Sequence, residues 1–275
     1  MKISAYIIFY NNENTILDSV NSIITQTHKV SEIILIDDGS TDNSYELLKG
    51  LNFKVYQNRK NRGRGFSRRL AHQLCTGDII LSLDATNVID KDFISRAFEI
   101  LMEEDLDAIY GRICQKNKVS ISEKWRSTHL YKDYIKQERK INDDFITYGS
   151  LIRRNSYENT CGYQVEQRFY EDSALGIAMI KNGSKILFEP TLLVYSISKE
   201  SIFNSLKRYT RWYSGIGERP SLLLYSRNIS YSIRHMVFVD IRLRYYSNIL
   251  FSLVCPHFQY IYQYYLFLKN KWKLA

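Results

Sequence analysis

The chain has 275 residues, of which 45% are hydrophobic and 24% are charged, and it contains only three prolines. This composition predicts a globular protein with room for a large core and excludes a disordered chain. The four cysteines lie far apart and show no CxxC spacing. That pattern argues against a cysteine-based zinc site or a disulfide framework and favours a reducing, cytosolic setting.

The formal net charge of +9 is concentrated at the C-terminal end of the chain. Residues 199–275 carry 12 Lys and Arg against 3 Asp and Glu, so the rest of the chain is balanced. A neutral body with a basic tail predicts an extended anionic partner, such as a membrane surface, a polyphosphate or a nucleic acid.

The first part of the chain alternates between predicted strands and predicted helices. The strands are expected at residues 2–10, 32–38, 53–58, 78–85 and 107–113, and the helices at residues 14–26, 42–50, 64–75 and 91–103. The first apolar run is too short for a signal peptide and is expected to form the first strand. Short links between strands and helices predict a parallel sheet that is covered on both faces.

The pattern is less regular after residue 113. Residues 121–140 are polar with helical spacing, residues 145–152 predict a strand, and residues 171–182 predict a helix. The apolar run 185–197 predicts strand structure that is broken at Pro190. Two further helical regions are expected, at residues 200–214 and from residue 229 to the end.

Acidic residues lie at the ends of two of the predicted strands, Asp37 and Asp38 at one and Asp84 at another. In open parallel sheets, ligands bind beyond the carboxyl ends of strands, near the point where the strand order reverses. If the first and fourth strands flank that point, these acids face one crevice with the end of the first strand. A single Asp after a strand also serves as a turn former or helix cap. Two adjacent carboxylates repel each other, however, unless a ligand or a cation compensates.

The stretches IDDGSTDNS, NRGRGFSRRLA and LSLDATN resemble family 2 glycosyltransferases of the GT-A fold. The resemblance covers roughly residues 1–215. It implies an α/β fold with a mostly parallel central sheet flanked by helices, to which the sequence adds a helical, basic and aromatic C-terminal extension. The expected domains are a catalytic domain at residues 1–215 and the extension at 216–275. The catalytic domain would comprise a nucleotide-binding half at 1–112 and an acceptor half at 113–215.

The resemblance implies that the strand-end residues bind a nucleotide-sugar, with a UDP-sugar favoured. Asp38 and Asp37 would contact the base and ribose, and Arg68 would face the nucleotide from the helix that follows the glycine-rich segment. The other expected contacts are the backbone of Phe9, Tyr10 and Asn11 around the base, and Asp84 with Ala85 at the end of the fourth strand.

The metal site of the family is only partly present. Family members usually carry Asp-x-Asp at the end of the fourth strand, where it binds Mg²⁺ or Mn²⁺ on the diphosphate. Here the motif reads Asp84-Ala85-Thr86, so Thr86 replaces the second acid. Hard cations favour carboxylate ligands. The sequence leaves three possibilities open: metal held by Asp84 with phosphate and water, weak metal binding, or basic side chains in place of the metal.

The resemblance also implies the catalytic residues. Asp172, in FYEDSALGIAMI, would be the general base that deprotonates the acceptor hydroxyl, with inversion at the anomeric carbon. Glu171 would orient the acceptor or pair with an arginine. Read without the resemblance, the two residues are an acid pair in the first turn of a helix, where the dipole favours negative charge.

A second element, KRYTRWYSGIG, resembles the family's Gln-x-x-Arg-Trp motif, with Arg208 in place of the glutamine. Arg211 would neutralise charge on the departing diphosphate, and Trp212 would stack on the acceptor sugar. Core packing for the tryptophan and a surface position for the arginine are the simpler alternatives.

Residues 249–268 contain no formally charged residue. A helix of this length could cross a bilayer, at a rise of about 1.5 Å per residue. The segment is rich in tyrosine, which prefers the membrane interface, and basic residues flank it. Two alternatives are therefore preferred to a span. One is an amphipathic helix on an anionic membrane leaflet. The other is a helical subdomain that packs on the catalytic body or on a second copy, as in a homodimer.

The sequence thus predicts an inverting, hexosyltransferase-type enzyme in the cytoplasm, peripheral on the cytoplasmic face of the membrane. Its acceptor would be a glycan or a polyprenyl-phosphate-linked sugar. The alternative is a catalytically silent protein of the same fold that binds nucleotide-sugars, which Thr86 motivates. A nucleic acid partner is disfavoured, because the strand-end acids would repel its phosphates.

Overall fold

The computed structural model describes residues 1–51, 53–142, 144–166, 170–214 and 219–274, the side chains of residue 214 and of 270–274 excepted. The chain divides into two compact units. Unit 1 comprises residues 1–114 and 137–198, and unit 2 comprises residues 115–136 and 199–275. This division differs from the expected boundary at residue 215, because residues 115–136 and 199–214 belong with the C-terminal helices. The functions assigned to the expected domains stay predictions.

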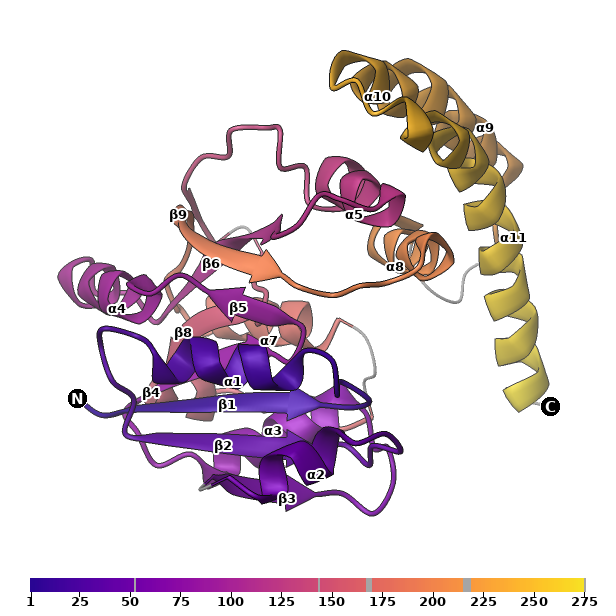
Figure 1. Cartoon of the computed structure of the whole chain (residues 1–275). Coiled ribbons are helices and arrows are strands. Elements are labelled where there is room, and N and C mark those ends of the chain that lie inside the picture. Colours follow the sequence, from indigo (N-terminus) through magenta and orange to yellow (C-terminus); the bar gives the residue numbers. More distant parts are fainter. Residues whose placement is uncertain (52, 143, 167–169, 215–218, 275) are drawn as a thin grey trace. The chain divides into compact units, whose positions relative to one another are not determined.

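Unit 1 is an α/β unit whose helices lie against a central sheet (Figure 1). Its strands are β1 (Ile3–Phe9), β2 (Glu32–Asp37), β3 (Lys54–Gln57), β4 (Ile79–Asp84), β5 (Asn87–Ile89), β6 (Ala108–Gln115, whose last residue is in unit 2), β7 (Lys140–Ile141), β8 (Gly149–Arg153) and β9 (Ile186–Ser196). Its helices are α1 (Ile16–Ile24), α2 (Ser44–Lys49), α3 (Arg64–Leu74), α4 (Phe93–Glu103), α6 (Arg154–Glu158) and α7 (Glu171–Lys181). The predicted alternation over residues 1–113 is confirmed.

The strand order in the described sheet is β3-β2-β1-β4-β8-β6-β9-β5, and β7 pairs with β9. The pairs β3–β2, β2–β1 and β1–β4 are parallel, whereas β4–β8, β8–β6, β9–β5 and β9–β7 are antiparallel. The sheet as a whole is thus mixed, with parallel pairing from β3 to β4 and antiparallel pairing in the pairs that involve β8 or β9. Strands β1 and β4 are neighbours, as expected, so the strand order reverses between them and their carboxyl ends lie side by side.

Several segments differ from the sequence-based predictions, among them β9, residues 121–140 and β5. β9 runs through Pro190, because this residue lies between the part of β9 that pairs with β7 and the part that pairs with β5. Of the helix expected over residues 121–140, the structure forms 121–130. Strand β5, only three residues long, carries too little periodicity to be predicted.

The period of two along each strand sorts the side chains onto two faces of the sheet. Along β1, Ile3, Ala5, Ile7 and Phe9 join a core with α1 and α4. Tyr6 and Ile8 face α3 on the other side. In β4 the same alternation puts Ile80 on the α3 side, and with it the polar positions 82 and 84. The α3 face therefore carries polar groups toward the carboxyl ends of the strands.

Unit 2 is helical. It contains α5 (Ile121–Trp125), η1 (Arg126–Leu130), α8 (Ile202–Ser214), α9 (Leu222–Tyr231), η2 (Ser232–Val237), α10 (Phe238–Arg242), η3 (Tyr246–Asn248) and α11 (Ile249–Leu274). The helical extension expected from the sequence is therefore present. Over the described residues, no helix is both long enough and apolar enough to cross a membrane.

Candidate active site

The polar cluster after β2 ties two loops together. Asn11, at a φ of 54°, accepts a hydrogen bond from the backbone N–H of Thr41 at 2.8 Å and donates its own N–H to Ser40 Oγ at 3.0 Å. The backbone N–H of Asn12 donates to Ser44 Oγ at 2.7 Å. These contacts fix the loop after β1 against the loop after β2. The hydroxyl and amide residues of DDGSTDNS therefore shape the rim of the strand ends.

Asp37 and Asp38 are buried, and hydrogen-bond donors of the protein compensate their charges. Asp37 accepts from the N–H of Ser40 and from Gln57 Nε2, both at 2.8 Å. Asp38 accepts four hydrogen bonds of 2.9 Å, from Asn58 Nδ2, Ser67 Oγ and the backbone N–H groups of Arg62 and Gly63. Gly63 is the N-cap of α3, and helix N-termini favour anions. The carboxylate of Asp38 therefore lies at a place that stabilises its negative charge.

This arrangement depends on Gly39. Its φ is +79°, and a Cβ at this position would lie 2.6 Å from the carbonyl carbon of Lys60 and 2.8 Å from the backbone nitrogen of Asn61. We therefore expect Gly39→Ala to displace the segment whose N–H groups bind Asp38 and to lower the free energy of unfolding by about 2 kcal/mol or more.

Gly50→Ala is the matched control for this prediction. Gly50 has a φ of −78°, and a Cβ there would meet nothing within 4 Å. We expect that variant to be as stable as the parent or slightly more stable in urea denaturation. Equal midpoints for the two variants would contradict the structural role given to Gly39.

Arg68 joins the end of β4 to the start of α7. Its side chain is 2% exposed. Nη2 lies 2.8 Å from Asp84 Oδ1, and Nε lies 3.4 Å from Glu171 Oε1. Nη1 donates to Ser82 Oγ at 3.1 Å, and Ser82 Oγ donates to the carbonyl of Thr147 at 2.8 Å. The buried guanidinium thus holds together two of the acids that the sequence assigned to the site.

The surroundings keep Arg68 charged. Burial acts to lower its pKa, but Asp84, Tyr6 and Glu171 raise that pKa well above the ordinary value. Tyr163 adds an aromatic face, with its ring centroid 6.0 Å from the guanidinium carbon. A buried charge of this kind is stable only when it is paired, because desolvation of an ion costs several kcal/mol.

Asp172 lies next to this ion pair, in the first turn of α7. The helix packs closely on Phe145, because a Cβ at Gly176 would lie 2.4 Å from Phe145 Cβ. Asp172 is half-buried and accepts the N–H of Ser173 at 3.0 Å. Burial, and then the charge of Glu171, raise the pKa of Asp172 to about 6, although Arg68 acts to lower it. A carboxylate with this pKa is a stronger base than an ordinary aspartate and is still ionised at neutral pH.

The end of β4 provides one carboxylate, that of Asp84, as a ligand for a metal ion. Asp84 is 25% exposed and already shares one oxygen with Arg68, whereas Ala85 is buried. The described residues contain no group of three or more His, Cys, Asp or Glu side chains that could hold a metal. These residues alone therefore do not fit a complete site for Mg²⁺ or Mn²⁺, and further oxygen ligands would have to come from a bound diphosphate and water.

Arg211 and Trp212 lie in the last turns of α8, in unit 2. Trp212 is 44% exposed, and its ring centroid lies 6.1 Å from that of Tyr131. Arg208, which stands where the family has glutamine, forms an ion pair with Glu200. The expected contacts of Arg211 and Trp212 with diphosphate and acceptor stay predictions.

Of the predicted nucleotide contacts, Phe9 is buried, and Tyr10 and Asn11 are exposed beyond the end of β1. The backbone N–H of Asp38 donates to the carbonyl of Phe9 at 2.8 Å, so these two strand ends are adjacent. The predicted convergence of strand-end residues in unit 1 is therefore present.

Sequence reasoning missed three residues around Arg68, namely Ser82, Tyr6 and Tyr163. Ser82 and Asp84 are two positions apart on one strand, so the period of two already placed them on one face. Tyr6 is the β1 neighbour of Ser82, and its hydroxyl lies 3.4 Å from that of Tyr163. Tyr163 carries no such signal, because it comes from a loop far away in the sequence.

A comparison with known protein families supports the resemblance seen in the motifs. The model of "Glycosyl transferase family 2" matches residues 4–161, more than half of the chain. The chain belongs to glycosyl transferase family 2. The matched part contains Asp37, Asp38, Arg68 and Asp84, and it ends before Asp172.

Curated relatives include synthases of a polysaccharide. The chain is 25% identical over 219 residues to the poly-beta-1,6-N-acetyl-D-glucosamine synthase of Staphylococcus aureus (strain MSSA476), which covers 75% of this chain and 52% of the relative. It is 26% identical over 223 residues to the synthase of the same name from Staphylococcus epidermidis, covering 78% and 54%. The chain therefore spans about half the length of the curated relatives it matches.

Solved structures confirm the GT-A type of fold. S. aureus TarS 1–349 in complex with UDP-GlcNAc has a TM-score of 0.58 and 19% identity, covering 76% of this chain and 66% of that one. TarS 1–349 in complex with UDP has a TM-score of 0.59 at 16% identity and covers 99% and 92%. GalNAc-T7 with UDP, GalNAc and Mn²⁺ has a TM-score of 0.57 at 19% identity and covers 73% and 44%.

Proposed function

We propose that this member of glycosyl transferase family 2 moves a sugar from a UDP-sugar to a glycan or lipid-linked acceptor, with inversion at the anomeric carbon. The observation that carries this proposal is the cluster built on Arg68. It brings Asp84 from the end of β4 and Glu171 from the start of α7 to one cation, with Asp172 beside them.

In the proposed reaction, Asp172 takes the proton from the acceptor hydroxyl. The hydroxyl oxygen attacks the anomeric carbon, and the bond between that carbon and the diphosphate breaks on the opposite side. UDP leaves with the bonding electron pair, and Asp172 holds the proton. Glu171 adjoins the base in α7, and Arg68 of α3 forms an ion pair with Glu171, so these two residues hold the first turn of α7 and position the base.

The donor would lie at the carboxyl ends of β1, β2 and β4. Asp37 and Asp38 use their oxygens within the protein, so we propose that they act by holding the loops that frame the base. Exposed Tyr10 and Asn11 would border the base. A UDP-sugar, and UDP-GlcNAc first among these, is the donor to test, because TarS is described with UDP-GlcNAc and the curated relatives are named for N-acetylglucosamine.

If Mg²⁺ or Mn²⁺ takes part, Asp84 is the residue that would hold it, together with oxygens of the diphosphate. The ion would neutralise charge on the departing diphosphate. We propose that Arg211 also contributes positive charge that neutralises the departing diphosphate.

The acceptor is proposed to be a glycan or a sugar carried on polyprenyl phosphate at the cytoplasmic face of a membrane. The basic composition of residues 199–275 supports an anionic surface near the acceptor. Trp212, which is exposed on α8, is the side chain proposed to stack on the acceptor sugar.

The reaction should lose rate as the pH falls through about 6. Asp172 accepts a proton only when ionised, and its pKa is raised to about 6. We therefore expect kcat/KM to level off above that pH and to fall about tenfold per pH unit below it. Because the charge of Glu171 helps to raise this pKa, Glu171→Gln should move the acid limb to lower pH. If kcat/KM stays constant between pH 5 and 7 while the protein remains folded, this would contradict the assignment of Asp172 as the general base.

The test of the function is a donor panel. Thermal shift with UDP-GlcNAc and other nucleotide-sugars, with and without Mn²⁺, should show a rise in Tm for the true donor. The same donors should then be hydrolysed slowly, as water replaces the acceptor. Binding of a nucleotide-sugar without hydrolysis or transfer to any glycan acceptor would favour the alternative, a silent binding protein.

A further inference from the structure

The longest helix of unit 2, α11, turns apolar side chains outward and polar side chains inward. Of its buried residues, Ser252, Gln259 and Gln263 are polar, and Cys255 and Pro256 are buried beside them. The exposed positions between 250 and 268 recur at intervals of three and four, so they form one stripe along the helix. This α11 stripe consists of Leu250, Leu253, Val254, His257, Ile261, Tyr264, Tyr265 and Leu268. The pattern is the reverse of that on a helix of a water-soluble protein.

The buried side of α11 joins a polar network. Ser252 Oγ donates to Asp240 Oδ2 at 2.6 Å and accepts from Trp125 Nε1 at 3.3 Å. His129 Nε2 lies 2.8 Å from Asp240 Oδ1 and 3.2 Å from Ser252 Oγ. Ser232 Oγ donates to the carbonyl of Ser252 at 2.6 Å. The polar inner side chains of α11 and α10 are therefore used within the unit, and this network fixes which side of α11 faces outward.

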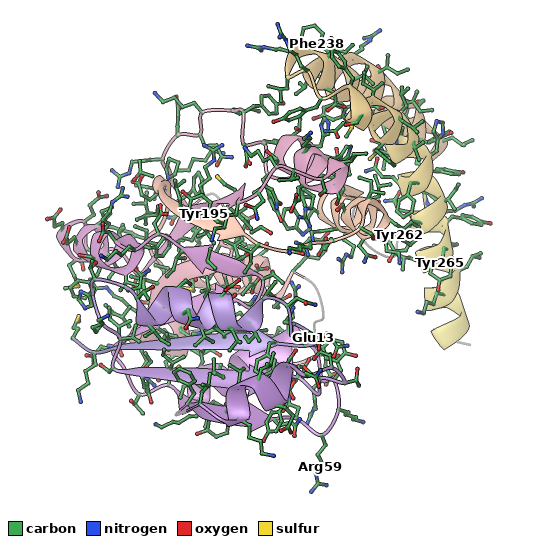
Figure 2. The ribbon with its side chains drawn as sticks, in the orientation of Figure 1. Glu13, Arg59, Tyr195, Phe238, Tyr262 and Tyr265 are labelled. Atoms are coloured by element: carbon green, nitrogen blue, oxygen red, sulfur yellow. The ribbon has the colours of Figure 1, made fainter. Side chains whose placement is uncertain are left out.

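The preceding segment, η2 and α10, shows the same feature in part, although apolar Met236 is buried there. Ser232 and Asp240 are buried, whereas Ile233, Phe238 and Ile241 are exposed. Figure 2 shows Phe238 at one end of the helices of unit 2. The three buried apolar clusters that the structure describes all consist of unit 1 residues. Unit 2 does bury apolar side chains, but it exposes a larger number of them along α9 to α11, an arrangement suited to a non-aqueous surrounding. The buried ones are Trp125, Leu130, Tyr131, Leu206, Tyr209, Met236 and Cys255.

The charges of the unit complement an anionic surface. Two acidic side chains are described within residues 199–274. Glu200 forms an ion pair with Arg208, and Asp240 is buried against His129 and Ser252. The cations at the ends of the stripe remain exposed. These are Arg242 and Arg244 before α11, and Lys269 in its last part.

We propose that the α11 stripe is the surface by which this chain lies on an anionic lipid bilayer. Its apolar side chains would lie at the boundary between headgroups and acyl chains, and the flanking cations would contact the headgroups. A second copy of the chain would bring like charges together at the ends of the stripe, and a polyanion would leave the stripe exposed to water. A lipid surface satisfies both features. The proposal concerns docking and does not depend on the transfer reaction.

Co-sedimentation with vesicles tests the proposal. The full chain should bind vesicles of phosphatidylcholine mixed with phosphatidylglycerol, bind phosphatidylcholine alone at least about tenfold more weakly, and release from the mixed vesicles as salt rises. Ile261→Glu should weaken binding by about tenfold or more, and Arg242→Gln and Lys269→Gln by about fivefold each. Ile141→Glu is the matched control, because Ile141 is 62% exposed on β7 against 68% for Ile261. It should bind as the parent does.

Each variant should keep its thermal shift with UDP, which shows that the fold and the donor site are intact. Unchanged vesicle binding by Ile261→Glu, or equal binding to neutral and anionic vesicles, would overturn the proposal. A concentration-dependent dimer that Ile261→Glu dissociates, with no vesicle binding by the parent, would overturn it in favour of a second copy. Loss of transfer with intact vesicle binding would instead count against the proposed function alone.

Discussion

Asp172→Asn is expected to abolish transfer while leaving donor binding intact. The amide cannot take a proton from the acceptor hydroxyl, so kcat should fall by about 10² to 10⁴-fold. The ion pairs of Arg68 are formed with Asp84 and Glu171, so the substitution at Asp172 leaves them in place. The dissociation constant for UDP should therefore change little. Rates of sugar transfer and of donor hydrolysis, together with UDP binding by calorimetry, measure the two effects separately.

Stability distinguishes this loss from unfolding. The pKa of Asp172 is raised in the folded state, so its ionised form destabilises the fold at pH values above about 6. The neutral amide should therefore melt at the same temperature as the parent or higher at pH 7. Asp18→Asn, on the exposed side of α1, is the matched control and should keep full activity. An active Asp172→Asn enzyme would remove this residue from the role of base.

Arg68→Met should be the most destabilising of the substitutions considered. Methionine fills part of the volume but leaves Asp84 and Glu171 without the cation between them. Removal of one partner from a buried ion pair costs about 3 to 5 kcal/mol, which for a chain of this size corresponds to a fall in Tm of roughly ten degrees. Urea denaturation followed by circular dichroism measures the change.

The neighbouring Arg69 provides the control, because its side chain is exposed. Arg69→Met should change the free energy of unfolding by less than about 0.5 kcal/mol. The double variant Arg68→Met with Glu171→Gln should regain part of the lost stability, because it removes one of the uncompensated acids. Equal stability of Arg68→Met and Arg69→Met would show that the ion pairs contribute nothing.

The parallel half of the sheet could be predicted from the sequence, because its signals are local. Apolar runs with turn residues between them placed β1 to β4 and their helices. The strand-end positions of Asp38 and Asp84 follow from the same pattern. Sequence reasoning did not foresee that Asp38 binds N–H groups of residues 62 and 63, because a turn 24 to 25 residues away has no periodicity that points to it.

That Asp84 and Glu171 both contact Arg68 could not be predicted either. It requires β8 to pair antiparallel with β4 and α7 to pack against Phe145, and both contacts join segments far apart in the sequence. The resemblance implied that Glu171 orients the acceptor or pairs with an arginine, without saying which arginine. The reversed pattern of α11 was hidden for a different reason. The side of α11 that faces inward depends on the contacts of Ser252 with Asp240 and His129, which belong to other segments of the chain.

The anomeric configuration of the sugar released from an α-linked UDP-sugar tests the central claim most directly. If Asp172 activates the hydroxyl for attack opposite the departing diphosphate, proton NMR at early times should show the β-anomer in the product. Appearance of the α-anomer first, or binding of the donor with no sugar released, would contradict an inverting transferase built around Arg68, Asp84 and Asp172.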